Sequence, residues 1–222
     1  AEGIILGIRG SVEVDCGAYF RSNGLTPPRN VVQFSSGPYR IENILIESYA
    51  RVTNKTPCGT YRAPGRFEGC FFCERLIEIA AREMGIDPVD MRRRNLIPER
   101  EMPYSLATMQ HIDPYTDTEC DSGDYRLTLD RCLEEFDWNE KVKLQGKFID
   151  GRYHGVSVGA FIEGGAAGPR EAARIALMDD GTIGVYVGSS ALGQGLETVL
   201  GQIAADALGM PFDRIKIFHG ST

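Results

Sequence analysis

The sequence predicts an α+β fold in which mixed sheets pack against helices, divided into two related halves. Segments that alternate apolar and polar side chains, as strands do, are separated by longer segments of helical periodicity. The order of strand, glycine-rich loop, helix and terminating glycine occurs twice along the chain. With 222 residues, of which 42% are hydrophobic, the chain can bury a sizeable core.

The first half, residues 1–145, begins with two predicted strands. Residues 4–20 and 40–54 alternate in polarity and are enriched in β-branched side chains, which favours strands. The segment between them is rich in glycine, proline and serine, so we expect a loop-rich connection there.

Three helices are predicted after these strands. Residues 67–84 keep apolar side chains on one helical face, and Gly85 is a typical C-terminal stop. Asp87 and Pro88 then predict the start of a short helix that ends near residue 95. Residues 124–143 form the third helix, for which we expect Asp121 or Ser122 as the cap. The half boundary is placed near residue 145.

The second half, residues 146–222, repeats strand, loop and helix. Asp180-Gly181 lies between two β-rich runs and predicts a hairpin. The shared order of the halves fits a diverged internal repeat, although two unrelated units remain an alternative. The predicted elements are strands at 152–161, 173–178, 182–187 and 215–218, and a helix at 196–208 that ends at Gly209.

Charge and hydropathy exclude several classes of protein. The net charge of -7, without a sustained basic region, argues against nucleic-acid binding. No run reaches the roughly 18 apolar residues of a membrane span, and the first residues lack a signal-peptide pattern. We therefore expect a cytoplasmic protein that binds neither nucleic acid nor membrane. Arg92-Arg93-Arg94 is interpreted as a solvated helix face, with an anion or partner contact as the alternative.

The six cysteines are too sparse for a disulfide scaffold. Cys70 and Cys73 form a CxxC pair, but they lie within a helical apolar pattern, which favours core thiols over a zinc or redox site. Cys58 adjoins a glycine loop and is the thiol that stands out, although a packed loop residue is the simpler interpretation. The three scattered histidines, His111, His154 and His219, are expected to be structural.

Two glycine-rich loops, residues 58–66 and 188–195, each run into a predicted helix. Backbone N–H groups at a helix N-terminus favour anionic ligands, so the pair indicates a large anionic cofactor. In the first loop Arg62 and Arg66 can bind oxyanions, and in the second Gln194, between Gly193 and Gly195, can donate and accept hydrogen bonds. Ordinary capped turns are the alternative. Neither loop is a Walker or dinucleotide motif.

One carboxylate stands out beside these loops. Glu163 follows a predicted strand and precedes glycines, so it either projects into a cleft or is an exposed loop carboxylate.

Two long blocks closely resemble the large subunit of molybdenum hydroxylases, the family of xanthine dehydrogenase, aldehyde oxidase and carbon monoxide dehydrogenase. The first block carries Thr53-Asn54, Pro57, Tyr61-Arg62, Gly65-Arg66, Glu68, Glu74, Ala80-Ala81, Gly85-Ile86-Asp87-Pro88 and Arg92-Arg93-Arg94-Asn95-Leu96-Ile97. The second carries Asp180-Gly181-Thr182, Gly193-Gln194-Gly195, Glu197-Thr198, Gln202-Ile203-Ala204-Ala205, Leu208-Gly209 and Gly220-Ser221-Thr222.

The resemblance implies two related subdomains of a molybdenum cofactor-binding domain, the second of them incomplete. It implies molybdopterin with Mo, in many bacterial members as the cytosine dinucleotide form. Arg62 would lie with its backbone near the oxygen ligand of the metal, without being a ligand itself, and Gly193, Gln194 and Gly195 would contact the cofactor. Pro64 and Glu163 are candidates for the substrate channel.

The family's chemistry is hydroxylation of an activated C–H in an aldehyde or N-heterocycle, with oxygen from water. Electrons pass to iron–sulfur clusters and FAD on other domains or subunits. Here Ala63 replaces the copper-binding cysteine of carbon monoxide dehydrogenases, which argues against carbon monoxide oxidation. Pro64 replaces a phenylalanine of purine-specific members, which argues against a xanthine pocket.

The chain is expected to be an internal piece of a longer subunit. The family's general-base glutamate lies outside it, so no catalytic residue is assigned, and the piece alone is expected to be inactive. Strands left without partners predict that it self-associates. The alternative from another class is a non-catalytic cofactor-binding or assembly module of the same fold.

Overall fold

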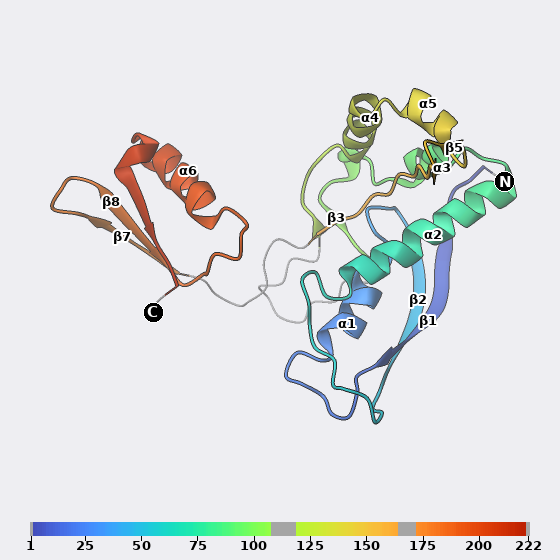
Figure 1. Ribbon diagram of the computed structural model, residues 1–222, viewed down its shortest axis with the longest axis horizontal. Helices are drawn as coiled ribbons and strands as arrows, with labels where there is room; N and C mark the ends of the chain where they lie inside the picture. The colour runs from blue at the N-terminus through green and yellow to red at the C-terminus, as the bar shows by residue number, and fades with distance from the viewer. Residues whose placement is uncertain (1, 108–118, 164–171, 221–222) are drawn as a thin grey trace. The chain divides into compact units, whose positions relative to one another are not determined.

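The computed structural model describes residues 2–107, 119–163 and 172–220, which fall into two compact units (Figure 1). Unit 1 spans Ala1–Gly165 and unit 2 spans Ala166–Thr222. Both units mix helices with small sheets, which confirms the predicted α+β class. Within the described residues, no helix is both long and apolar enough to cross a membrane.

Unit 1 begins with two parallel strands, β1 (Gly7–Asp15) and β2 (Asn43–Arg51). Helix α1 (Thr26–Gln33) lies between them, so the predicted loop-rich connection is confirmed on both sides of this helix and wrong only at Pro27-Pro28. A parallel pair requires a crossover, and here the crossover is helical. Pro27 and Pro28 lie in the first turn of α1, where a missing N–H costs no helical hydrogen bond.

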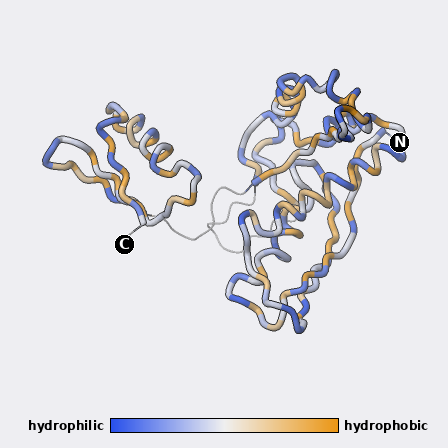
Figure 2. The backbone as a smooth tube through the Cα atoms, in the orientation of Figure 1, coloured by the Kyte–Doolittle hydropathy of each residue, from blue (hydrophilic) through white to orange (hydrophobic). Residues whose placement is uncertain are grey.

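Helix α2 (Arg66–Met84) follows β2 after the first glycine loop and lies along the sheet in Figure 1. Its Cys73, Ile77 and Ala81 are buried, and Ile8 and Ile44 of the sheet pack on the same cluster. Figure 2 shows hydrophobic and hydrophilic residues alternating around α2, as expected for a helix with one buried face. The predicted bounds of this helix and its stop at Gly85 are confirmed.

Helix α3 (Pro88–Asn95) confirms the predicted start, because the Asp87 side chain accepts hydrogen bonds from the N–H groups of Val89 and Asp90. The third predicted helix is shorter than expected. Helix α4 (Tyr125–Glu135) is capped by Asp124, not by Asp121 or Ser122. Asp137 has a φ of +58°, which ends α4 before α5 (Trp138–Lys141) and the 3-10 turn η2 (Val142–Leu144).

Short pairs complete unit 1. Strands β3 (Tyr104–Ser105) and β4 (Glu119–Cys120) are antiparallel, as are β5 (Phe148–Ile149) and β6 (Arg152–Tyr153), and η1 spans Glu99–Glu101. The strand predicted over 152–161 is therefore paired only at its start. Residues 153–163 nevertheless alternate between exposed and half-buried side chains, the strand periodicity that the sequence shows.

The described part of unit 2 contains a three-stranded sheet in the order β7 (Ala173–Leu177), β8 (Ile183–Val187) and β9 (Ile215–Phe218), together with the α-helix α6 (Leu196–Leu208). The antiparallel β7–β8 pair confirms the hairpin predicted around Asp180-Gly181. Helix α6 connects β8 to the parallel strand β9, and Gly201 of α6 lies against the ring of Phe212. The 3-10 turn η3 spans Phe212–Arg214.

Candidate functional site

The first glycine loop is held against α1 by tight packing at its end. Gly65 caps α2 with a φ of +76°, which L side chains rarely adopt. A Cβ on Gly65 would lie 2.1 Å from the carbonyl oxygen of Pro27. The buried Asn30 also donates from Nδ2 to the carbonyl oxygen of Pro64 at 2.9 Å. The fold of unit 1 therefore fixes the backbone of this loop, and only glycine fits at position 65.

The approach to the loop is held by a second set of polar contacts. Asp15, at the end of β1, accepts hydrogen bonds from Thr53 Oγ1 at 2.7 Å and from the N–H of Gly17 at 3.0 Å, and it pairs with Lys55 at 2.7 Å. These contacts, led by Lys55, lower the pKa of Asp15 to about 2. Further along, Asn23 Nδ2 donates to Thr60 Oγ1 at 2.6 Å.

Glu163 and Arg66 form an ion pair, although they are far apart in the sequence. The Arg66 guanidinium also lies 4.8 Å from the ring centroid of Phe34, and its Nε is buried without a partner among the residues that the structure describes. Burial, together with repulsion from Arg29, lowers the pKa of Arg66. The structure thus brings Glu163 to the first loop, where the sequence alone offered only a cleft or an exposed position.

Arg62 and Pro64 lie on this same loop. The Arg62 side chain is exposed, and among the described residues it has no hydrogen bond or ion pair. Pro64 is half-buried, and its carbonyl is bound by Asn30. Arg62 therefore offers a free guanidinium on a fixed backbone, which suits an anionic or oxygen-rich ligand.

The second glycine loop is open. Gly193 and Gly195 have φ values of +97° and +74°, and a Cβ on either would meet no atom of the described residues within 4 Å. Gln194 does not extend outward, because its Oε1 accepts from the N–H of Leu192 and its Nε2 donates to Ser190 O at 3.1 Å. Its amide thus shapes the loop, while the backbone of the two glycines stays approachable by a ligand.

A contact between His219 and Glu197 lies at the start of α6. His219 Nε2 lies 2.7 Å from Glu197 Oε1, and its Nδ1 is buried without a partner in the described part of the chain. The contact connects the end of β9 to the first turn of α6, in agreement with the expected structural role. His111 lies outside the described residues.

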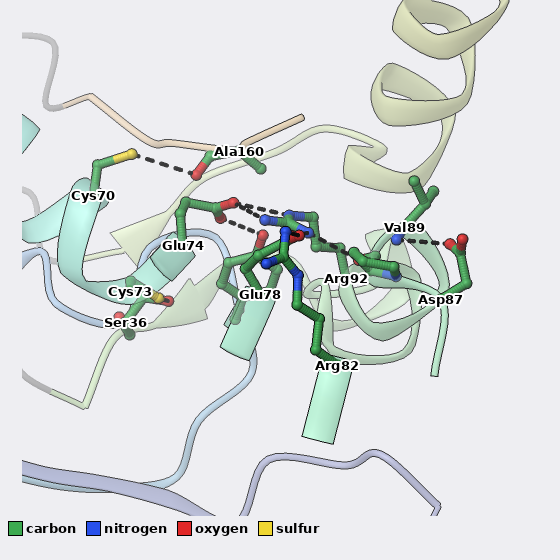
Figure 3. A network of polar contacts seen from close by, with 12 residues as sticks. Ser36, Cys70, Cys73, Glu74, Glu78, Arg82, Asp87, Val89, Arg92 and Ala160 are labelled. Atoms are coloured by element: carbon green, nitrogen blue, oxygen red, sulfur yellow. Dashed lines mark hydrogen bonds and ion pairs between the residues drawn. The ribbon is translucent and has the colours of Figure 1, made fainter. Parts of the chain in front are cut away.

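A buried charge network beneath α2 was missed by the sequence interpretation (Figure 3). Arg92 is only 2% exposed and binds Glu74 Oε2 at 2.8 Å, Glu78 Oε2 at 3.4 Å and the carbonyl of Pro88 at 2.9 Å. The expectation of a solvated face was therefore wrong for Arg92, though Arg94 is exposed. The signal was present, because Glu74 and Glu78 lie one turn apart on the face of α2 that carries buried residues.

The CxxC pair belongs to the same region. Cys73 is buried with its sulfur 3.6 Å from Ser36 O, and burial raises its pKa to about 12. The half-buried Cys70 points to Ala160 O at 3.8 Å (Figure 3). Within the described residues no group of three metal-ligating side chains is close enough to hold an ion. These observations confirm Cys73 as a core thiol.

The two glycine loops lie in different units, so each stands as a half-site. The prediction that they line one crevice stays a prediction. In both loops a left-handed glycine leads into a helix N-terminus, the arrangement that the sequence predicted for contact with an anionic cofactor.

Two family models match this chain, both described as molybdopterin cofactor-binding domains, over residues 1–96 and 131–222. The chain belongs to the molybdenum hydroxylase family. Each of the two matched regions contains one of the glycine loops. The mixture of helices and small sheets agrees with this membership.

Individual proteins that are similar to the chain support this membership. The gamma subunit of the 6-hydroxypseudooxynicotine dehydrogenase complex of Paenarthrobacter nicotinovorans is 34% identical over the whole chain, and the nicotine 6-hydroxylase large subunit of the same organism is 28% identical. The chain spans 28% of the length of each. The crystal structure of quinoline 2-oxidoreductase from Pseudomonas putida 86 matches 99% of the chain, and 29% of its own, at 25% identity with a TM-score of 0.72.

Proposed function

We propose that this chain is the central cofactor-binding part of a molybdenum hydroxylase large subunit, and that the parent protein hydroxylates a C–H bond of an N-heterocycle or an aldehyde with oxygen from water. The observation that carries the proposal is the first glycine loop. Its backbone is fixed by α1, its Arg62 is free of partners among the described residues, and Glu163 is attached beside it through Arg66.

The residues of both loops fit an anionic molybdopterin. Around the first loop, the arginines at 29, 62 and 66 outnumber the carboxylates of Glu68 and Glu163, and the buried Nε of Arg66 has no partner in the described part of the chain. In the second loop, the open backbone at Gly193 and Gly195 lets a large ligand approach closely. When bound, the cofactor supplies a molybdenum centre that takes two electrons from the substrate.

The residues of this chain would bind the cofactor and orient the substrate. Arg62 would place its backbone near the metal's oxygen ligand, while Gly193, Gln194 and Gly195 would contact the cofactor from the second unit. Pro64 and Glu163 would border the substrate channel, with Glu163 held in place by Arg66. Because the general base is expected elsewhere in the parent subunit, the 222 residues alone are proposed to be inactive.

An N-heterocycle is the preferred substrate class. Two relatives are named for nicotine 6-hydroxylation and quinoline 2-oxidoreduction, and both nicotine and quinoline contain an aromatic nitrogen ring. Iron–sulfur and FAD-containing domains or subunits are the proposed electron partners, since one relative is named as a subunit of a dehydrogenase complex. The cytosine dinucleotide form of the cofactor, a cytoplasmic location and a subdomain boundary near residue 145 complete the proposal.

The test uses the full-length parent protein produced in a host that makes molybdopterin. We expect bound molybdenum and pterin, and reduction of an artificial electron acceptor with an N-heterocycle such as quinoline. Arg62→Ala should lower turnover at least tenfold, whereas Arg100→Ala, at an exposed position 75% accessible, should leave it unchanged. A purified protein that contains neither molybdenum nor pterin would refute the proposal.

The same preparation separates the enzyme from a non-catalytic cofactor-binding or assembly module. Such a module would contain cofactor yet reduce no acceptor with N-heterocycles or aldehydes. The isolated 222-residue chain is proposed to self-associate, because β1 and β2 form a two-stranded parallel sheet whose outer edges have no strand partner in the described residues. Analytical ultracentrifugation that shows only monomer would contradict this part.

A further inference from the structure

Two cysteines meet at the root of the first glycine loop. Cys16 directly follows β1, and Cys58 directly precedes Gly59, the first glycine of the loop. The N–H of Cys58 donates to the carbonyl of Cys16 at 3.2 Å. Next to Cys16, a Cβ on Gly17 would lie 2.4 Å from the carbonyl oxygen of Thr56. The two backbone segments therefore run side by side in close contact.

The thiols of these residues are both free and differ in accessibility. Cys16 is buried, whereas Cys58 is half-buried. Burial raises the pKa of the Cys16 thiol, and the neighbouring Cys58 thiol raises it further by charge repulsion and a hydrogen bond. The Cys16 sulfur itself lies 4.0 Å from the carbonyl oxygens of Val14 and Gly24, and the backbone hydrogen bond holds Cys58 next to it. A more accessible thiol thus lies beside a shielded one.

We propose that Cys16 and Cys58 are a reversible oxidation site, at which a disulfide ties the end of β1 to the start of the first glycine loop. The hydrogen bond between the Cys58 N–H and the Cys16 carbonyl keeps the two backbones in contact, as a disulfide requires with its Cα–Cα span of roughly 4.4–6.8 Å. The site takes a peroxide as its oxidant. The site adjoins the loop on which the proposed function depends, but formation of the disulfide does not rest on that function.

The chemistry proceeds in two balanced steps. The Cys58 thiolate attacks hydrogen peroxide, which breaks the O–O bond and gives a sulfenic acid and hydroxide. The Cys16 sulfur then attacks the Cys58 sulfur, the S–S bond forms, and the sulfenic oxygen leaves as water with the thiol proton. Two electrons pass from the pair of thiols to one peroxide. Because Cys16 must lose its proton, closure is expected to be faster at higher pH.

The other four cysteines provide a contrast. Cys70 and Cys73 lie on one helix and point to different carbonyls, at 3.8 and 3.6 Å. Cys120 is buried beside Tyr125, and Cys132 is exposed on α4. Because Cys132 is exposed and α4 contains no second cysteine, it serves as a control for non-specific oxidation.

The experiment treats the fully reduced 222-residue chain with a small excess of hydrogen peroxide, blocks the remaining thiols with iodoacetamide, and maps the peptides by mass spectrometry. We expect a mass loss of about 2 Da, a linked peptide pair that contains Cys16 and Cys58, and its disappearance with dithiothreitol. Cys132→Ser should retain the linked pair, while Cys58→Ser should lose it.

The wild-type peptide map decides the proposal even if a cysteine variant fails to fold. Oxidation of Cys58 to the sulfinic acid without a linked pair would overturn it, and so would a link that joins other cysteines or two chains. A crosslink without molybdopterin in the parent protein would leave this site established and refute only the proposed function. Cofactor without a crosslink would do the reverse.

Discussion

Helices α2 and α6 begin and end in the same way, yet they are held by different means. Each begins at a left-handed glycine and ends at another, with φ values of +76° and +65° in α2 and +74° and +63° in α6. The residue that follows the terminating glycine donates its N–H to the carbonyl five positions earlier. This distance is 2.9 Å from Ile86 in α2 and 3.0 Å from Met210 in α6. This shared geometry supports the repeat that the sequence suggested.

The difference lies in what surrounds each helix. Helix α2 is anchored from outside, by Arg92 at its middle and by α1 at its first glycine. Helix α6 packs through small residues, and its glycine loop is held mainly by its own Gln194. The same local signals can thus build one loop that is held by the surrounding fold and another that is held by its own side chain. Substitutions should therefore affect unit 1 far more than unit 2.

The largest effect is expected at Arg92. Arg92→Ala would leave the carboxylate of Glu74 buried without its cation, which should lower the free energy of unfolding of unit 1 by about 3–5 kcal/mol. Arg93→Ala is the matched control, because Arg93 pairs with Asp90 and Asp130 on the surface and should cost about 0–1 kcal/mol. Urea unfolding followed by circular dichroism measures both. Equal losses would show that α2 does not depend on this anchor.

The two helix-starting glycines test the comparison directly. Gly65→Ala adds strain at positive φ and a collision with the Pro27 carbonyl, so a loss of about 2–4 kcal/mol is expected. Gly195→Ala adds the strain alone and should cost about 1–2 kcal/mol. Amide hydrogen exchange resolves the two units separately. A greater loss at Gly195 would mean that its loop is packed against something in solution.

Several elements could be predicted because their signals are local. The stop at Gly85, the cap at Asp87 and the hairpin at Asp180-Gly181 each depend on a few adjacent residues, whose backbone preferences decide the structure. The glycine loops were also recognised from their spacing. Local signals can also mislead, as at Pro27, where proline favours a loop and the first turn of a helix alike.

The elements that were missed depend on contacts between distant residues. Arg92 is buried only because Glu74 and Glu78 of another helix face it, and a run of three arginines alone suggests solvent. Glu163 and Arg66 lie far apart in the sequence, so only the folded chain brings them together. Residues 153–163 have a strand's alternation but pair only at their start in the described structure, since pairing requires a partner strand that periodicity does not reveal.

Removing the side chains that hold the two loops should give a smaller difference in stability. Asn30→Ala removes the hydrogen bond that the buried Asn30 side chain donates to the carbonyl of the half-buried Pro64, which should destabilise unit 1 by about 1–2 kcal/mol. Gln194→Ala removes two exposed hydrogen bonds and should change stability by less than about 0.5 kcal/mol. Thermal denaturation of both variants measures the difference. If Gln194→Ala is the more damaging, the second loop is not self-contained.

The smallest expected effect is the loss of folding stability at low pH. Asp15 in unit 1 and Asp180 in unit 2 each accept from a threonine hydroxyl and pair with a lysine, and these contacts hold both pKa values below the usual range, that of Asp15 at about 2. A lowered folded pKa stabilises the protein above the unfolded value of about 3.9, and this contribution is lost as pH falls towards the folded value.

Each unit should therefore lose some stability between about pH 4 and pH 2, and the loss should be small because both carboxylates are solvated and screened. Asp15→Asn should flatten this dependence in unit 1 alone, and Asp180→Asn should do so in unit 2 alone. Amide exchange measured across this pH range follows each unit. If Asp15→Asn altered unit 2 as well, the two units would unfold as one cooperative body, and the contrast between fixed and self-contained loops would not hold.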